Sequence, residues 1–149
     1  MGRTVGAWAG LVLAACMAGQ VLAETATLSL PGGQDESVPA GGVVGVDGPG
    51  LRLMLTEVTD QRCPSQYDCY WEGLIRAVIL VNSDAQGAQF VVLCNMCDDG
   101  GREAVVAGYR LTLDRLEPEH AVIEQLDSQL GRAVLLADYT VVVTIAAAP

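Results

Sequence analysis

The sequence contains no lysine, one histidine and few aromatic residues. Its 149 residues include 18 aspartates and glutamates against 8 arginines, which gives a formal net charge of −10 at pH 7. Such an acidic surface argues against nucleic acid and anionic lipid as partners. Because Phe, Tyr and Trp make up only 5% of the chain, we expect a core built mainly from Val, Leu, Ile and Ala.

Catalytic motifs are also missing from the sequence. A serine or cysteine triad would have to use His120, the only histidine, and no Gly-x-Ser-x-Gly or comparable nucleophile motif accompanies it. We therefore expect His120 to lie exposed in a loop and the chain not to be an enzyme. The acidic pairs at 35–36 and 98–99 lack the alternating ligand spacing of a calcium loop, so we interpret them as turn residues and expect neither a metal nor a cofactor.

The amino terminus has the features of an export signal. Arg3 precedes a small and apolar stretch, residues 5–19, that is too short to span a membrane. Two processing routes remain open: a signal peptide of residues 1–23 cleaved after Ala23, or a lipoprotein signal of residues 1–15 with acylation of Cys16. We favour the first, because the apolar residues after Cys16 would make a poor tether in solvent. Both routes predict a periplasmic or secreted protein, which would contact the outer membrane only through a lipid on Cys16.

The remaining cysteines form an even set. Once Cys16 is removed or acylated, Cys63, Cys69, Cys94 and Cys97 are left, and four cysteines allow three pairings. We favour the two local bridges, 63 with 69 and 94 with 97, because each closes within one turn, while a crossed pairing stays open. An oxidising compartment favours the disulfide state.

Cys94 and Cys97 also have the spacing of a redox dithiol. Such a pair can cycle between its reduced and oxidised forms when the pKa of one thiol is lowered. Here Asp98 and Asp99 follow, and nearby carboxylates raise a thiol pKa, so a structural disulfide is favoured. Zinc would need a second pair of cysteines at matching spacing, which the sequence lacks.

The first cysteine pair belongs to a distinctive corner, residues 60–73. Cys63 and Cys69 enclose five residues, Pro64 fixes one backbone angle, and Gly73 closes the unit before a long apolar run begins. So small a ring stabilises the fold by only about 2 kcal/mol, so its main effect would be on the local shape of the turn.

Trp71 raises a choice between core and surface. In strand alternation it shares a face with Ile75 and Ala77, which predicts a buried side chain. The alternative is a ligand-binding aromatic patch formed with Tyr67 and Tyr70, and we favour the buried tryptophan.

Alternating apolar residues predict a fold of strands. We expect eight segments, one of them weak, at residues 25–30, 43–46 (the weak one), 51–55, 74–81, 89–93, 103–107, 109–116 and 133–145. The run at 74–81 is apolar on both faces, which is typical of a central strand buried on two sides. One helix is expected at 121–130, ending at Gly131. Seven or eight strands in residues 24–149 indicate one all-β domain, an antiparallel β-sandwich of Ig-like or related type, with a barrel as the alternative.

The corner motif also resembles a known pattern. Asp60, Arg62, Cys63, Pro64, Cys69, Trp71 and Gly73 form Asp-x-Arg-Cys-Pro-(x4)-Cys-x-Trp-x-Gly. This is similar to a family of small secreted or lipid-anchored bacterial β-proteins of unknown function, and the strand from Tyr109 to Pro118 resembles a second feature of that family. Gln61 departs from the small residue expected there, and Cys94 and Cys97 lie outside the pattern. The resemblance implies a β-domain outside the cytoplasm and implies no activity.

The leading functional hypothesis is a non-enzymatic, extracytoplasmic module that binds or scaffolds another molecule, an unknown protein or surface ligand, through its loops. Two alternatives are a thiol-disulfide redox protein that uses Cys94 and Cys97, and a metal-binding domain.

Overall fold

The computed structural model describes residues 25–33, 43–46, 50–131 and 133–149. Its strands and helices are β1 (Ala26–Pro31), β2 (Val43–Val46), β3 (Leu51–Arg62), β4 (Gly73–Ser83), β5 (Gly87–Cys94), β6 (Glu103–Val106), β7 (Tyr109–Glu117), the helix α1 (His120–Leu130), the short 3-10 helix η1 (Leu136–Asp138) and β8 (Thr140–Ala147). The expected signal segment, with Cys16, and the acidic pair at 35–36 lie outside the described residues.

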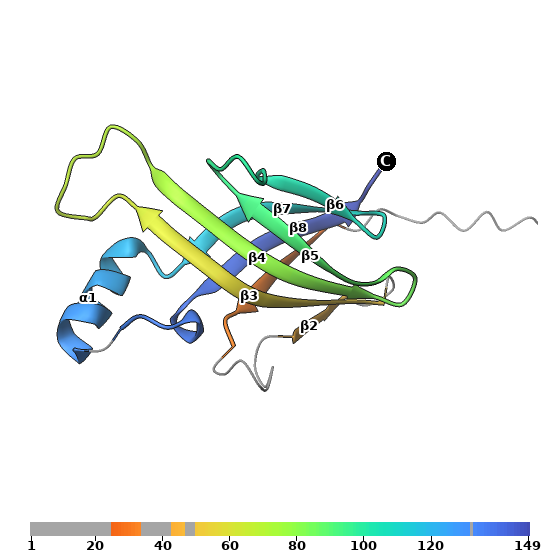
Figure 1. Ribbon diagram of the computed structural model, residues 1–149, viewed down its shortest axis with the longest axis horizontal. Helices are drawn as coiled ribbons and strands as arrows, with labels where there is room; N and C mark the ends of the chain where they lie inside the picture. Colours follow the sequence, from red (N-terminus) through yellow and green to blue (C-terminus); the bar gives the residue numbers. More distant parts are fainter. Residues whose placement is uncertain (1–24, 34–42, 47–49, 132) are drawn as a thin grey trace, which may run out of the picture.

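The strands form two antiparallel sheets of four strands each (Figure 1). One sheet has the order β1-β8-β7-β6 and the other β2-β3-β4-β5. Single bridges join the sheets on both sides, between Gly32 and Leu55 and between Leu93 and Gly101, but the described strands do not close into a barrel. The prediction of an all-β sandwich is therefore confirmed, and the barrel alternative is wrong.

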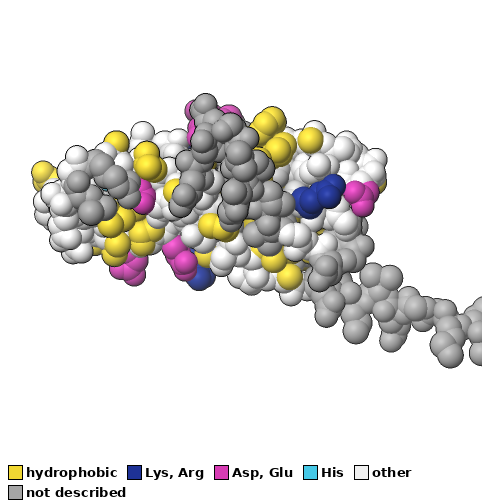
Figure 2. All heavy atoms as spheres, turned by 90° about the horizontal axis from the view of Figure 1, so that it is seen from below, with side chains coloured by type: hydrophobic (Ala, Val, Ile, Leu, Met, Phe, Trp, Pro, Cys, Tyr) yellow, Lys and Arg dark blue, Asp and Glu magenta, His cyan; other side chains and the backbone are white. Residues whose placement is uncertain are grey.

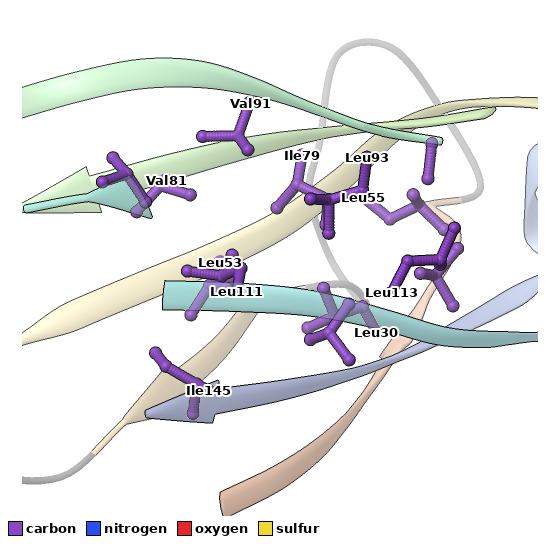
Figure 3. Packing of buried hydrophobic residues seen from close by; sticks show 14 of the residues in the cluster. Leu30, Leu53, Leu55, Ile79, Val81, Val91, Leu93, Leu111, Leu113 and Ile145 are labelled. Carbon is purple, nitrogen blue, oxygen red and sulfur yellow. The ribbon is translucent and has the colours of Figure 1, made fainter. Parts of the chain in front are cut away.

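The core lies between the two sheets and is aliphatic (Figure 3). Alternate residues of each strand point inward, as period-2 patterning requires. The largest fully buried side chains of this core, contributed by both sheets, are Leu30, Leu51, Leu53, Leu55, Ile79, Val81, Leu93, Leu111, Leu113, Val141 and Val143. Phe, Tyr and Trp contribute no fully buried side chain among the described residues, in agreement with the expected Val, Leu, Ile and Ala core.

One expectation for β4 needs correction. Its odd-numbered positions, such as Ala77, Ile79 and Val81, are buried, but Val78 and Leu80 on the opposite face are only half-buried. The strand does lie inside its sheet, between β3 and β5. It is therefore central within its sheet but buried on one face only.

Two β-bulges reverse the inward face of long strands. In β3 the register shifts between Leu55 and Glu57, and in β7 it shifts between Leu113 and Arg115. A bulge adds one residue to one strand of a pair, so the residues beyond it swap faces. In β3 the even-numbered residues point inward after the bulge, and these include Asp60 and Arg62.

The helix matches its prediction, and the segment after it does not. α1 buries Ile123 and ends at Gly131, whose φ of 59° is left-handed and whose N–H donates to the carbonyl of Asp127. No helix in the described part of the chain is long and apolar enough to cross a membrane. The strand expected at 133–145 is shorter than predicted, because η1 precedes β8 and leaves Leu135 54% exposed.

Candidate functional site

A covalently closed loop projects from one end of the sandwich. Residues 63–72, which we call the aromatic loop, connect β3 to β4 and extend beyond the ends of the sheets, above α1 in Figure 1. The structure joins Cys63 to Cys69, the local pairing that the sequence favours. Backbone hydrogen bonds from Cys63 N–H to the Glu72 carbonyl and from Tyr67 N–H to the Pro64 carbonyl hold the loop further.

The aromatic side chains of this loop face solvent. Tyr67 is 66% exposed, Tyr70 is 105% exposed and Trp71 is 54% exposed. The prediction that Trp71 lies in the core is therefore wrong. β4 begins only at Gly73, whose φ of 88° is incompatible with an extended strand, so strand alternation cannot be counted back through it to Trp71.

Gly73 is required at this position for a second reason. A Cβ there would collide with the backbone of Gln61 and Arg62, because the two strands leave the loop in close contact. The base of the loop is therefore narrow and fixed.

A buried ion pair lies directly beneath the loop. The Arg62 guanidinium donates from Nε to Asp60 Oδ1 at 2.8 Å and from Nη2 to Asp60 Oδ2 at 2.7 Å. It also donates to the carbonyls of Leu116 at 3.1 Å and Pro118 at 2.9 Å, at the end of β7. The side chains of Asp60 and Arg62 are only 2% and 13% exposed. The pair therefore ties the end of β3 to the opposite sheet.

The charge of Asp60 is stabilised in place. Burial opposes the charged carboxylate, but the hydrogen bonds and charge of Arg62 outweigh it and hold the pKa of Asp60 below its usual value. The pKa of the neighbouring Tyr139 hydroxyl shifts in the opposite direction. Burial, together with the Asp60 carboxylate, raises the pKa of Tyr139 to about 12.

His120 lies in this cluster and not in an exposed loop, so that expectation is wrong. It is the first residue of α1 and its side chain is 19% exposed. Its Nδ1 lies 3.3 Å from Asp60 Oδ2 and its Nε2 lies 3.6 Å from Glu124 Oε1, one helical turn further on. A carboxylate thus lies near each ring nitrogen, with Asp60 at hydrogen-bond distance.

The hydroxyl of Ser65 lies beside this cluster and contacts Glu124. The Ser65 hydroxyl donates to Glu124 Oε2 at 2.6 Å, and neither nitrogen of His120 has a hydroxyl partner among the described contacts. In a serine triad the base must accept the proton of the nucleophile. The Ser65 contact instead connects the aromatic loop to α1.

The second disulfide loop lies beside the base of the first. The structure joins Cys94 to Cys97, and Asn95 between them accepts from Ile75 N–H at 2.7 Å and donates from its side-chain amide to the Gly73 carbonyl at 2.9 Å. Cys94 is 1% exposed. Both disulfide loops are therefore held against the start of β4.

Asp99, just after the Cys94–Cys97 loop, belongs to an ion-pair network at the surface. Arg76 on β4 donates to Asp99 at 2.8 Å and to Glu57 on β3 at 2.8 Å. The hydrogen bond from Arg76 lowers the pKa of Asp99. Asp99 is thus engaged in an ion pair. Among the described residues, no group of three or more His, Cys, Asp or Glu could hold a metal ion.

The sequence identified several of these residues but not their assembly. It placed Asp60, Arg62, Pro64 and Gly73 in one corner, and the structure shows that Asp60 and Arg62 form its ion pair, while Pro64 turns the loop. It missed Glu124, Tyr139 and Asn95, which come from distant segments. Comparison of the chain with models of protein families, with curated proteins and with solved structures found no match.

Proposed function

We propose that the chain is exported and that its β-sandwich is a non-enzymatic module that binds another molecule through the aromatic loop. One observation carries the proposal: Tyr67, Tyr70 and Trp71 are exposed together on a loop that is closed by the Cys63–Cys69 disulfide. Large aromatic side chains exposed at one place are typical of binding surfaces, because they bury much area at a small cost in conformational entropy.

The anchoring of the loop supports the same proposal. The disulfide, the Asp60–Arg62 pair below it and the Ser65–Glu124 hydrogen bond beside it restrain the loop before any partner arrives. A restrained loop loses less conformational entropy on binding, so more of its contact energy appears as affinity.

Export is supported by the two cysteine pairs at disulfide distance, which suit an oxidising compartment.

A thiol-disulfide function for Cys94 and Cys97 has less support. Cys94 is almost fully buried, and the loop follows a strand instead of opening a helix, whose amino end would lower a thiol pKa.

Photo-crosslinking tests the proposal. A photoreactive phenylalanine analogue replaces Tyr70 in one strain and Phe90 in another, and the exported protein is irradiated in its native compartment. Phe90 is the matched control, because it is 69% exposed but lies on β5 away from the loop. We expect a discrete adduct from position 70 only. Equal labelling from both positions, or no adduct from position 70, would refute the proposal.

A further inference from the structure

In the sequence of the loop, each aromatic group is followed directly by an acidic residue. Tyr67 precedes Asp68, and Tyr70 and Trp71 precede Glu72, and all of these side chains are exposed. No basic residue occurs between 63 and 72, and Arg62 below the loop is committed to Asp60. The exposed chemistry of the loop is therefore aromatic and anionic.

The surroundings of the loop are also negatively charged. α1, which contacts the loop through Glu124 and Ser65, also carries Asp127 and has no arginine or lysine. The view in Figure 2 shows hydrophobic and acidic side chains together at the α1 end of the molecule. With a net charge of −10 overall, this end attracts cations and repels phosphate groups and anionic lipids.

Aromatic faces and carboxylates together suit one class of ligand group. A guanidinium or ammonium group is attracted to the face of Trp or Tyr, and arginine is found there more often than lysine. The planar guanidinium can stack on a ring and at the same time donate two parallel hydrogen bonds to a carboxylate.

We propose that the aromatic loop recognises a basic segment of a partner protein, with arginine or lysine side chains stacked on Tyr70 and Trp71 and paired with Asp68 and Glu72. The loop projects from the domain, so an extended segment of another protein can reach its side chains (Figure 1). This inference rests on the proposed function and adds the chemistry of the partner.

Peptide titration tests the inference on the exported protein, with Trp71 fluorescence as the signal. Three short peptides alternate leucine with arginine, with glutamine or with glutamate. We expect only the arginine peptide to change the fluorescence, with an affinity that falls steeply as salt is added. The double variant Asp68→Asn/Glu72→Gln should weaken this binding by about tenfold, because both counter-charges are removed while the rings remain.

The matched control variant removes two negative charges at positions away from the loop. Asp84 and Glu103 are exposed acids whose side chains lie near Arg52 and Arg110, away from the loop. The variant Asp84→Asn/Glu103→Gln should bind the arginine peptide within about twofold of wild type. Equal weakening in both double variants would mean diffuse attraction to an acidic protein and would overturn the inference. So would binding of the glutamine peptide, or of a neutral oligosaccharide, as tightly as the arginine peptide.

The cross-linking experiment separates this inference from the proposed function. If the adduct at position 70 persists unchanged in the Asp68→Asn/Glu72→Gln background, the loop is a binding surface but its partner is not recognised by charge. If the protein that carries the analogue at position 70 and is otherwise unchanged yields no adduct, both proposals fail. Loss of the adduct in that background, with retention in the Asp84→Asn/Glu103→Gln background, supports both.

Discussion

Replacing Arg62 with methionine is expected to destabilise the domain strongly. The change keeps an unbranched apolar stem but removes the guanidinium and its four hydrogen bonds, two to Asp60 and two to the carbonyls of Leu116 and Pro118. Asp60, only 2% exposed, then keeps the backbone N–H of residue 62 and His120 but loses the guanidinium that neutralises its charge. Breaking a buried ion pair in this way costs about 3–5 kcal/mol, a large fraction of the roughly 5–15 kcal/mol that stabilises a typical domain.

Urea denaturation followed by far-UV circular dichroism, at neutral pH and with the disulfides intact, measures this cost. Arg115→Met is the control, because Arg115 pairs with Glu117 at the surface, where the two side chains are 61% and 45% exposed. An exposed pair contributes about 1 kcal/mol or less. The double variant Asp60→Leu/Arg62→Met should be less destabilised than Arg62→Met alone, because no unpaired charge remains. If Arg62→Met and Arg115→Met lose similar free energies of unfolding, the pair does not hold the two sheets together.

The same pair gives the stability a pH dependence with a definite sign. The folded-state pKa of Asp60 is lowered, so its contribution is fully present above the unfolded value of about 4 and is lost as pH falls through the folded value. Arg62→Met removes the side-chain hydrogen bonds and the positive charge that lower this pKa, while the backbone N–H of residue 62 and His120 remain. We therefore expect the stability difference between wild type and Arg62→Met to shrink below about pH 4, and a difference that stays constant down to pH 2 would contradict the account.

Three further outcomes are expected. Gly73→Ala should lower the free energy of unfolding by more than about 1 kcal/mol in urea titrations. The residue has φ of 88°, and its new Cβ would collide with the backbone of Gln61. An unchanged free energy of unfolding would refute the close approach. The double variant Cys63→Ser/Cys69→Ser should lose only about 2 kcal/mol and remain folded by circular dichroism, because the ring is short; global unfolding would contradict a local role. Half-burial and the Asp60 carboxylate raise the folded pKa of Tyr139 to about 12, so its contribution to stability is present below about pH 10 and is lost as pH rises toward 12. Absorbance titration of wild type against Tyr139→Phe should show one tyrosine that ionises late, and an ordinary titration would refute this environment.

Strand alternation predicted most of the sandwich because the pattern is local. Within the predicted strand 51–55, Leu51, Leu53 and Leu55 alternate with exposed or half-buried residues, and all three are buried in the structure. α1 was predicted for the same reason, since its apolar spacing and Gly131 are both visible in the sequence. These features depend only on neighbouring residues and on a surface that must be buried.

The errors arose where the chain departs from regular geometry. Trp71 was assigned to the core by counting alternate residues through Gly73, whose backbone is not extended. The segment before β8 was predicted as strand, but η1 turns it away from the sheet. A pattern of apolar residues does not show where the regular backbone begins.

The contacts below the loop could not be predicted from one sequence. His120 and Arg62 make their contacts across 60 and 54 residues of chain, to Asp60 and to the Leu116 carbonyl. Asp60 and Arg62 face inward only because the bulge in β3 reverses the alternation. Such contacts follow from the packing of the two sheets, which must be known first.

Fluorescence quenching of Trp71 measures whether the aromatic loop presents its rings to solvent. In a Trp8→Phe variant Trp71 is the sole tryptophan, and acrylamide quenching is compared between the folded protein and the urea-unfolded chain. The account predicts that Trp71 in the folded protein is quenched nearly as efficiently as in the unfolded chain, in keeping with its 54% exposure. Strong protection from acrylamide with blue-shifted emission would place the ring in the core and contradict the account.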